Sequence, residues 1–252
     1  MNGSRSPISS ESIEHFIKAT VAESSMNRLS SIDTGPIFDQ PLIGVADGWD
    51  PLFTEYKQII GYFHLTPMEV LQGTVPLDQR KQIGEDISVV CWVLPFAERI
   101  RSSNAMKSGL PASPLWSHGQ EYGEKFNDYL RQQVVQFLAS KGYLAVAPMR
   151  SPLYVKLSRY VTNWSERHAL YAAGMGTFSL SGWFITERGM AMRCASVVVN
   201  ARLTPTPRCY TSHTENCPFY SHGTCGKCID RCPAKAITTN GLNKPQCREY
   251  LD

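Results

Sequence analysis

Apolar residues recur every three or four positions in two long segments of the chain, residues 10–26 and residues 119–141. This spacing places the apolar side chains on one face of a helix. The second segment is followed directly by Gly142, and glycine commonly ends a helix. The pattern therefore predicts two amphipathic helices, each with one face packed against a core.

Shorter segments predict further helices and several buried strands. Thr66-Pro67-Met68-Glu69 has a capping residue, a proline at the first helical position and a glutamate three residues after the cap, which is how many helices begin. Apolar runs of strand length predict buried strands. The further short helices are expected at Pro51–Ile60 and Ser165–Ala173, and the strands at Ile87–Pro95, Tyr143–Pro148, Trp183–Thr186 and Cys194–Arg202.

Two stretches lack a hydrophobic period and predict loops. One is Gly/Pro/Asp-rich and reaches residue 51, and the other is Ser/Gly/Pro-rich and covers residues 102–118. A Pro-rich linker at residues 203–208 marks a boundary near residue 205. We therefore expect an α+β fold with a large domain at residues 1–204 and a small domain at residues 205–252.

The composition is that of a folded protein and narrows the possible partners. Of the 252 residues, 42% are hydrophobic and 19% are charged. The net charge of +3 is too small to indicate a nucleic-acid partner, which requires a clustered basic surface. The apolar runs are too short to span a bilayer, and the N-terminus lacks the apolar core of a signal peptide. We expect a cytoplasmic protein without a membrane partner.

Six of the eight cysteines crowd into the last 44 residues. The other two, Cys91 and Cys194, stand alone in apolar surroundings, where a buried thiol is the plainer interpretation. Dense clustering in a chain without an export signal favours a metal site over a disulfide framework. The candidate metal ligands are Cys209, Cys217, Cys225, Cys228, Cys232 and Cys247.

The spacing of the clustered cysteines is typical of an iron–sulfur site. Cys225-x2-Cys228-x3-Cys232-Pro233 matches the last three positions of the bacterial ferredoxin pattern C-x2-C-x2-C-x3-C-P. Close spacing lets a tight turn bring several thiolates onto one [4Fe-4S] cluster. Pro233 is expected to end the loop and to start a short helix at residues 234–237.

The spacing leaves the remaining ligands open. His222 occupies the first position of the ferredoxin pattern, and Cys217 could replace it through a longer loop. Cys217 could thus complete a single cluster with the three cysteines of the motif. Alternatively, Cys247 and Cys232 could serve a second cluster, with Cys209 as a further ligand. Zinc is the alternative metal, because a lone C-x2-C also suits zinc.

The C-terminal run from Cys217 to Pro233 resembles the two-cluster ferredoxin module of epoxyqueuosine reductases and of their relatives, the cobalamin-dependent reductive dehalogenases. Residues 163–181, with Ala172-Ala173-Gly174-Met175-Gly176, resemble the segment that precedes this module in the reductases. The resemblance covers residues 85–250 and, more loosely, the rest. It implies a nitroreductase-like and cobalamin-processing-like α+β domain, followed by a small ferredoxin-like iron–sulfur domain.

The resemblance also implies cofactors, partners and a reaction. Electrons from a low-potential donor, a ferredoxin or a flavodoxin, would pass through one or two [4Fe-4S] clusters to a bound cobalamin. Reduced cobalt would then drive the two-electron cleavage of a C–O or C–halogen bond in a small organic molecule. The protein would position the corrin, exclude water and supply a proton.

Three departures from the epoxyqueuosine reductases argue against tRNA as a partner. Those enzymes carry Asp-Thr-Gly-Pro before the glycine-rich turn, and its aspartate is taken as the proton donor, whereas this chain has Trp164–His168 in that region. Their tRNA-reading helical repeats are absent. Their downstream second cysteine cluster is absent too, because the sequence stops at Asp252. A truncated protein or a divergent single-cluster protein would both fit.

The candidate catalytic residues are Glu166 and His168, which flank a predicted helix start close to the glycine-rich turn. The alternative is a capping glutamate and a surface histidine. The two glycines of the turn would let the backbone approach a flat cofactor, or would simply end the helix. The candidate cofactor-binding residues are Trp164, Ser165, Arg167, Gly174, Gly176 and Thr177.

Two classes of function follow. The first is an iron–sulfur, cobalamin-dependent reductase that cleaves a bond in a small organic substrate. The second is a cluster-bearing electron-transfer or corrinoid-handling accessory protein without substrate chemistry of its own. The large domain before the cysteines favours the first class, because a simple electron carrier does not need it. The missing aspartate favours the second.

Overall fold

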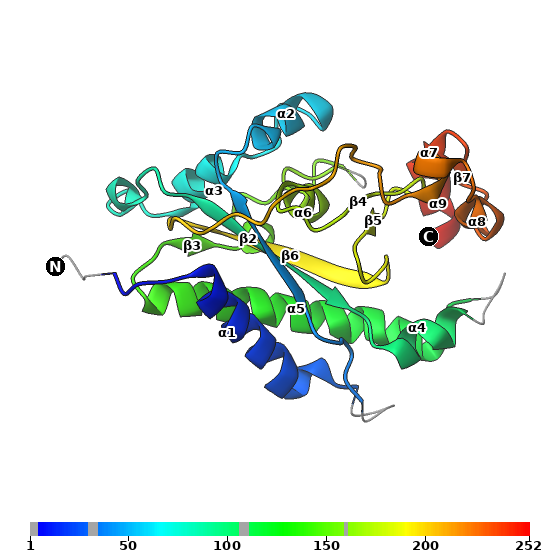
Figure 1. Cartoon of the computed structure of the whole chain (residues 1–252), viewed down its shortest axis with the longest axis horizontal. Coiled ribbons are helices and arrows are strands. Elements are labelled where there is room, and N and C mark those ends of the chain that lie inside the picture. The colour runs from blue at the N-terminus through cyan, green and yellow to red at the C-terminus, as the bar shows by residue number, and fades with distance from the viewer. Residues whose placement is uncertain (1–4, 30–34, 106–110, 159–160) are drawn as a thin grey trace.

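The computed structural model describes residues 5–29, 35–105, 111–158 and 161–252. At its centre lies a four-stranded antiparallel sheet with the strand order β1-β2-β6-β3 (Figure 1). Helices cover both faces of this sheet, so the main body has three layers. The mixed α+β class expected from the sequence is confirmed. The strands of the sheet are β1 (Leu42–Asp47), β2 (Ser88–Pro95), β3 (Ala145–Val146) and β6 (Met192–Val199).

The central pair of strands, β2 and β6, separates two hydrophobic cores. Every residue of β2 is buried, as its continuous apolar run predicts. Because side chains alternate along a strand, Trp92 faces one core and Cys91 faces the other. The antiparallel register places Cys91 opposite Ser196 and Val93 opposite Cys194. This register brings Cys194 and Ser196 of β6 to the same face as Cys91.

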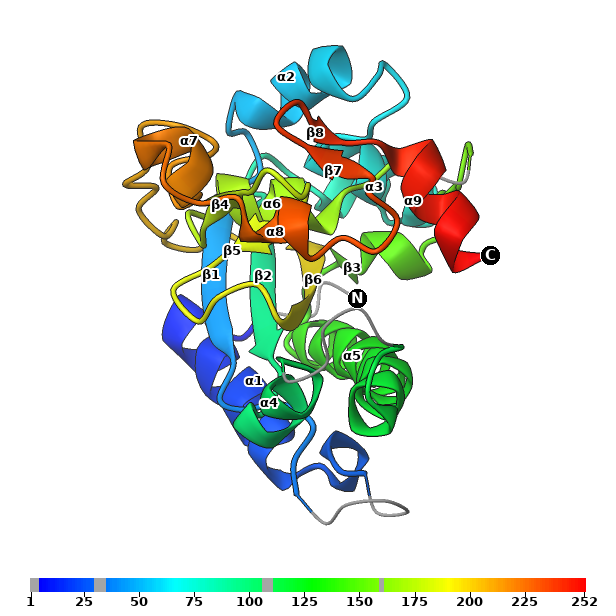
Figure 2. The same cartoon turned by 90° about the vertical axis from the view of Figure 1, so that its right-hand side faces the viewer.

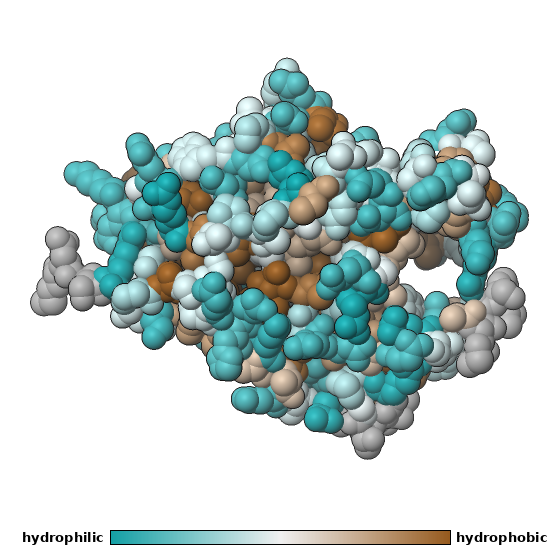
Figure 3. Space-filling model, viewed as in Figure 1, coloured by the Kyte–Doolittle hydropathy of each residue, from teal (hydrophilic) through white to brown (hydrophobic). Residues whose placement is uncertain are grey.

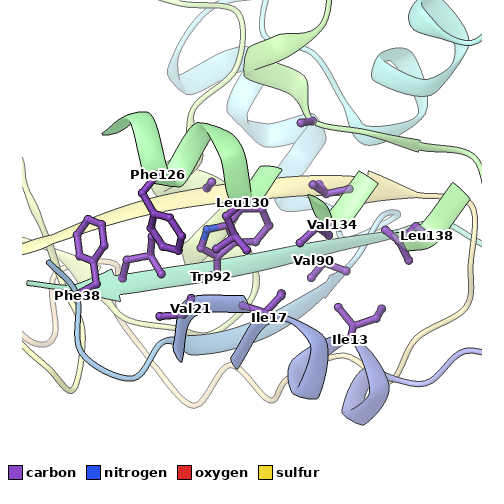
Figure 4. Packing of buried hydrophobic residues seen from close by; sticks show 14 of the residues in the cluster. Ile13, Ile17, Val21, Phe38, Val90, Trp92, Phe126, Leu130, Val134 and Leu138 are labelled. Carbon is purple, nitrogen blue, oxygen red and sulfur yellow. The ribbon is translucent and has the colours of Figure 1, made fainter. Parts of the chain in front are cut away.

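The first core lies between the sheet and the two amphipathic helices, α1 (Ser10–Glu23) and α5 (Pro114–Ser140). Figure 4 shows Ile13, Ile17 and Val21 of α1 and Phe126 to Leu138 of α5 pointing toward Val90 and Trp92 of β2. The predicted apolar faces therefore meet on one side of the sheet.

The second core lies on the opposite face, under α2 (Leu52–Ile59), α3 (Pro67–Thr74) and α6 (Glu166–Ala172). Helix α3 begins with the predicted capping box, in which the Thr66 hydroxyl accepts from the Glu69 N–H and the Glu69 carboxylate accepts from the Thr66 N–H. Phe53, Leu71 and Leu170 are among its buried side chains.

Two predicted loops contain regular structure instead. The stretch up to residue 51 contains β1, an edge strand that pairs with β2 from Leu42 to Asp47. The stretch 102–118 contains the end of α4 (Glu98–Ala105) and the first turns of α5, capped by Ser113. Residues 106–110 lie outside the described part. The glycines and prolines of these stretches disfavour a strand or a helix locally, but tertiary pairing and packing outweigh this local preference.

The C-terminal segment forms a small module at one end of the sheet (Figure 2). The helix expected at residues 234–237 is not formed, since Ile237–Thr238 is a strand that pairs with Gly241–Leu242. The remaining elements of the chain are α7 (Pro218–His222), α8 (Lys227–Asp230), α9 (Lys244–Leu251), β4 (Thr177–Phe178), β5 (Phe184–Ile185), β7 (Ile237–Thr238), β8 (Gly241–Leu242) and the 3-10 helices η1 (Ser25–Asn27), η2 (Arg80–Gln82) and η3 (Pro148–Arg150).

The predicted linker runs along the free edge of β1. The Thr206 N–H donates to the Val45 carbonyl, and the Thr206 hydroxyl accepts from the Val45 N–H. Arg208 then pairs with Asp50 at 2.7 Å. These contacts cover an edge that would otherwise present unpaired backbone groups. In the described ranges no helix combines the length and apolarity needed to cross a membrane.

Candidate active site

Glu166 opens helix α6 and lies almost completely inside the protein, with 9% of its surface exposed. One carboxyl oxygen, Oε2, accepts a hydrogen bond from the Ser196 hydroxyl on β6. Burial raises the pKa of Glu166 to about 7, and Arg131 and Ser196 only partly oppose this shift. At neutral pH Glu166 can therefore hold a proton and release it, which is what a general acid requires.

Arg131 of α5 faces Glu166 from the other side. It is 3% exposed, and its Nη1 lies 2.9 Å from the Glu124 carboxylate. Its Nε lies 3.9 Å from Oε1 of Glu166. Among the described residues, neither of these two facing atoms has a hydrogen-bond partner, although both are buried. Buried polar atoms without partners are costly, so a ligand or a water that bonds to both would be favoured here.

Both residues line a cleft of about 760 Å³ between the sheet, the start of α6 and the C-terminal module. This volume is within the range of small-molecule sites. The main body supplies Trp164, Glu166 and Cys194, and helix α9 supplies Lys244 and Cys247. Burial raises the pKa of the Cys194 thiol to about 12, so this thiol stays neutral. The cleft therefore has a wall from each of the two predicted domains.

His168, the second predicted catalytic residue, does not line this cleft. Its ring packs against Tyr56 and Phe178, each at a centroid distance of 4.8 Å. The Ser165 hydroxyl bonds to Nδ1 of His168 at 2.7 Å and makes no capping hydrogen bond to α6. Burial is the main reason that the pKa of His168 is lowered to about 3. His168 thus belongs to a buried aromatic cluster.

His64 belongs to the same cluster, although nothing in the sequence singled it out. Its ring stacks on Trp164 with a centroid distance of 5.9 Å and lies 6.5 Å from the ring of His168. Burial lowers the pKa of His64 to about 4, so the ring is neutral under ordinary conditions.

Three of the predicted cofactor-binding residues line the cleft: Trp164, Ser165 and Arg167. The guanidinium of Arg167 lies over the ring of Trp183 at 5.6 Å and donates to the Gly182 carbonyl. These contacts hold a flat aromatic and cationic surface at the cleft wall.

The other three predicted cofactor-binding residues lie elsewhere and pack against protein. A Cβ at Gly174 would meet the Pro207 carbonyl at 2.5 Å, and a Cβ at Gly176 would meet the Ile185 carbonyl at 2.1 Å. Thr177 is fully buried and accepts from the Asn216 N–H. Here the glycines let chain segments approach each other, and neither lines the cleft.

Two of the predicted cysteine ligands, Cys217 and Cys225, lie within electrostatic range of a third, Cys228. The pKa of Cys228 is raised, first by burial and then by the neighbouring Cys217 and Cys225 thiols. The Cys217 sulfur is buried and accepts from the Leu180 N–H at 3.5 Å, which ties it to the main body. In the described ranges, however, no three His, Cys, Asp or Glu side chains converge as metal ligands. Thiolates of this number and spacing remain the donor set that an iron–sulfur cluster uses.

The other predicted ligands are spread over the module. Cys232 and Cys247 are partly buried, whereas Cys209 is exposed at the end of the linker. Cys247 lines the cleft from α9.

Sequence reasoning missed Arg131 and Ser196, the two residues that complete the surroundings of Glu166. Arg131 looks like one more charge on a long helix, and Ser196 looks like a small residue in an apolar strand. One signal was available, because the period of α5 places Arg131 beside Leu130 and Val134, on the buried side.

No protein-family model and no curated protein matches this chain. Among solved structures, an epoxyqueuosine reductase from Bacillus subtilis is similar over 94% of this chain and 55% of its own length, with 16% identity and a TM-score of 0.47. An epoxyqueuosine reductase with an epoxyqueuosine-modified stem loop of tRNA-Tyr gives the same coverage and identity, with a TM-score of 0.42. The chain thus spans about half the length of these proteins.

Proposed function

We propose that this chain is the catalytic part of an iron–sulfur oxidoreductase that reduces a small organic molecule in the cleft beside Glu166. The observation that carries the proposal is the composition of the cleft walls. One wall holds a buried carboxylic acid, and the other wall, α9, carries Cys247 of the cysteine-rich module. A cluster held by Cys247 would therefore bring an electron source to the cavity that also holds the proton source.

The reaction would be a reductive cleavage, in which a carbon–heteroatom bond accepts two electrons and one proton. The carbon–heteroatom bond breaks, the leaving group departs with its electron pair, and a carbon–hydrogen bond forms. Glu166 is suited to give the proton, because burial holds its pKa near 7. Arg131 would then stabilise the carboxylate that remains, at the distance of 3.9 Å that already separates the two groups.

Electrons would enter through the module from a low-potential ferredoxin or flavodoxin. Cys217, Cys225, Cys228 and Cys232 are the proposed ligands of one [4Fe-4S] cluster, with Cys247 and Cys209 as the further candidates. A cluster held there would lie near an electron donor bound to the module surface, because no residue of α7 or α8 is fully buried.

Cobalamin is the finer part of the proposal. Trp164, Ser165 and Arg167 would lie against it, since these residues line the cleft. The unpartnered atoms of Arg131 and Glu166 match the amide groups at the edge of a corrin, which both donate and accept hydrogen bonds. Bound cobalamin would supply the two-electron reduction. Gly174, Gly176 and Thr177 have no part in this site.

The test compares wild-type protein, prepared anaerobically with its iron and sulfide, with the variant Glu166→Gln. With cobalamin, a strong reductant and a panel of small organohalides and epoxides, the wild type should release halide or the reduced product. The variant should lose most of this rate but keep its iron. Absence of turnover with a protein that binds cobalamin and holds reducible iron would instead support a corrinoid-handling accessory protein.

A further inference from the structure

The side chains that line the cleft carry an excess of positive charge. Six basic side chains line it, against two acidic ones. Because the whole chain has a net charge of only +3, this excess is concentrated in one place. The basic residues are Arg131, Lys156, Arg167, Arg193, Lys244 and Arg248, and the acidic residues are Glu124 and Glu166.

The two carboxylates do not neutralise this excess. Glu124 is shared between Arg131 at 2.9 Å and Arg193 at 3.5 Å. Glu166 is buried beside Ser196, and its raised pKa keeps much of it protonated at neutral pH. Arg248 pairs with Asp252, which does not line the cleft.

Three of the cations, Lys156, Arg167 and Lys244, have no ion pair in the described part of the chain, and Arg167 is held by the Gly182 carbonyl and the Trp183 ring. The side chains of Lys156 and Lys244 are exposed, and both line the cleft. Lys156 comes from the loop before α6, and Lys244 is the first residue of α9. The two lysines thus place positive charge at the cleft from both predicted domains, where it can attract an anionic ligand.

Deeper in the cleft lie buried guanidinium donors that make no hydrogen bond. The Nε atoms of Arg131 and Arg193 are buried and face carboxylates at 3.9 Å (Glu166) and 3.5 Å (Glu124), but they make no hydrogen bond to the described residues. Arg131 itself is 3% exposed. Guanidinium donors without a hydrogen bond at the wall of a cationic cleft are groups that recognise a carboxylate or a phosphate.

We propose that the substrate of this cleft is an organic oxyanion, a small molecule whose carboxylate or phosphate is bound by Lys156 and Lys244. Its role as substrate rests on the function proposed above, whereas its binding does not.

The test uses three probes that share one ring: phenyl phosphate, benzoate and the neutral benzamide. They are titrated into the whole chain, prepared anaerobically with iron and sulfide and then oxidised, without cobalamin. Tryptophan fluorescence, to which Trp164 and Trp183 at the cleft contribute, reports binding. Both anions should bind roughly tenfold or more tightly than benzamide, because a charged hydrogen bond is stronger than a neutral one. The ratio of the two anions distinguishes a phosphate site from a carboxylate site.

Lys156→Ala and Lys244→Ala should each weaken binding of the preferred anion by roughly tenfold. Lys81→Ala removes the same charge from an exposed position outside the cleft and should leave the affinity unchanged. Added KCl should weaken binding of the anions more than binding of benzamide, because salt screens exposed charges.

Three results would overturn the inference. The first is equal affinity for all three probes, and the second is unchanged affinity in the two cleft variants. The third is displacement of phenyl phosphate by cobalamin but not by benzoate, which would assign the lysines to the phosphate of the cofactor. Failure of the proposed function looks different, since oxyanions would still bind while the reduction assay with Glu166→Gln and wild type showed no turnover in either protein.

Discussion

At the residue scale, a chain of buried polar contacts joins the sheet to the candidate site. Asn127 of α5 is fully buried, accepts from the Trp92 indole N–H at 3.0 Å and donates to the Cys194 carbonyl at 3.0 Å. Arg131, one turn further along α5, donates to the same carbonyl at 3.4 Å. The position of Arg131 opposite Glu166 is therefore fixed by hydrogen bonds to the backbone of β6.

Replacing Asn127 by Ala should destabilise the protein by about 2–3 kcal/mol, because the buried Trp92 N–H and Cys194 carbonyl both lose a partner. Urea unfolding followed by far-UV circular dichroism measures this change. Asn240→Ala, at an exposed turn, is the matched control and should cost much less. A loss below about 0.5 kcal/mol for Asn127→Ala would contradict the proposed role.

Glu166 predicts a distinct pH dependence of stability. Its pKa is 4.5 in the unfolded chain and about 7 in the folded protein, so between these values the folded state binds the proton more tightly. The contribution of Glu166 is therefore complete below pH 4.5 and is lost as the pH rises through 7, by on the order of 3 kcal/mol. Glu166→Gln should remove this loss, and its stability relative to wild type should increase from pH 5 to pH 8.

Chemical unfolding of both proteins across this pH range measures the effect. Glu55→Gln, an exposed substitution on α2, should run parallel to wild type. Parallel curves for Glu166→Gln as well would show that the carboxyl is not protonated in the folded protein.

At the scale of single elements, short helices depend on their caps more than on their length. Helix α3 has eight residues, and its capping box satisfies two backbone N–H groups at the first turn. It covers β3 and β6 beside the second core. On the side of the molecule seen in Figure 1, apolar residues reach the surface in places, and hydrophilic residues surround them (Figure 3). Loosening such a helix would expose more of the core.

Thr66→Ala should lower the melting temperature and cost about 1 kcal/mol, because the hydroxyl that accepts from the Glu69 N–H is lost. Thr54→Ala changes an exposed threonine in α2 and should have almost no effect. Differential scanning calorimetry of both variants measures the change in melting temperature. Equal changes in the two variants would mean that the cap does not stabilise the protein.

At the scale of the whole molecule, hydrogen bonds at several points join the cysteine-rich module to the main body. The linker pairs with β1, the Cys217 sulfur accepts from the Leu180 N–H, and Arg208 pairs with Asp50. Figure 1 shows the module at one end of the main body. In residues 209–252 only Cys217 and Ala236 are buried, so metal binding would organise a segment with few buried side chains.

Cys225→Ser should abolish bound iron and acid-labile sulfide after anaerobic preparation, because it removes a thiolate of the motif. Cys91→Ala removes a buried thiol of the sheet and should keep both. Iron and sulfide analysis with the visible spectrum is the measurement. Zinc without sulfide in the wild type would show that the thiolates serve a different metal.

The sequence by itself determined the local features of this protein. The apolar periods placed α1 and α5, the capping residues placed α3, and the spacing Cys225-x2-Cys228-x3-Cys232 pointed to one kind of metal chemistry. Each of these rests on residues a few positions apart, whose interaction is fixed by helix or turn geometry. Glu166 was recognisable for the same reason, since it opens a helix.

The tertiary structure alone decided which distant residues meet. The site draws on four separate segments of the chain, which carry Arg131, Glu166, Ser196 and Lys244. Only the folded arrangement of these segments brings Arg131, Glu166 and Lys244 to one cleft and places the Ser196 hydroxyl against Glu166. The same packing buried His168 away from the cleft and filled the space beside Gly174 and Gly176 with backbone. The burial of a side chain and the clustering of charges depend on which residues are neighbours in space. These neighbours are far apart along the chain, so the sequence alone does not predict them.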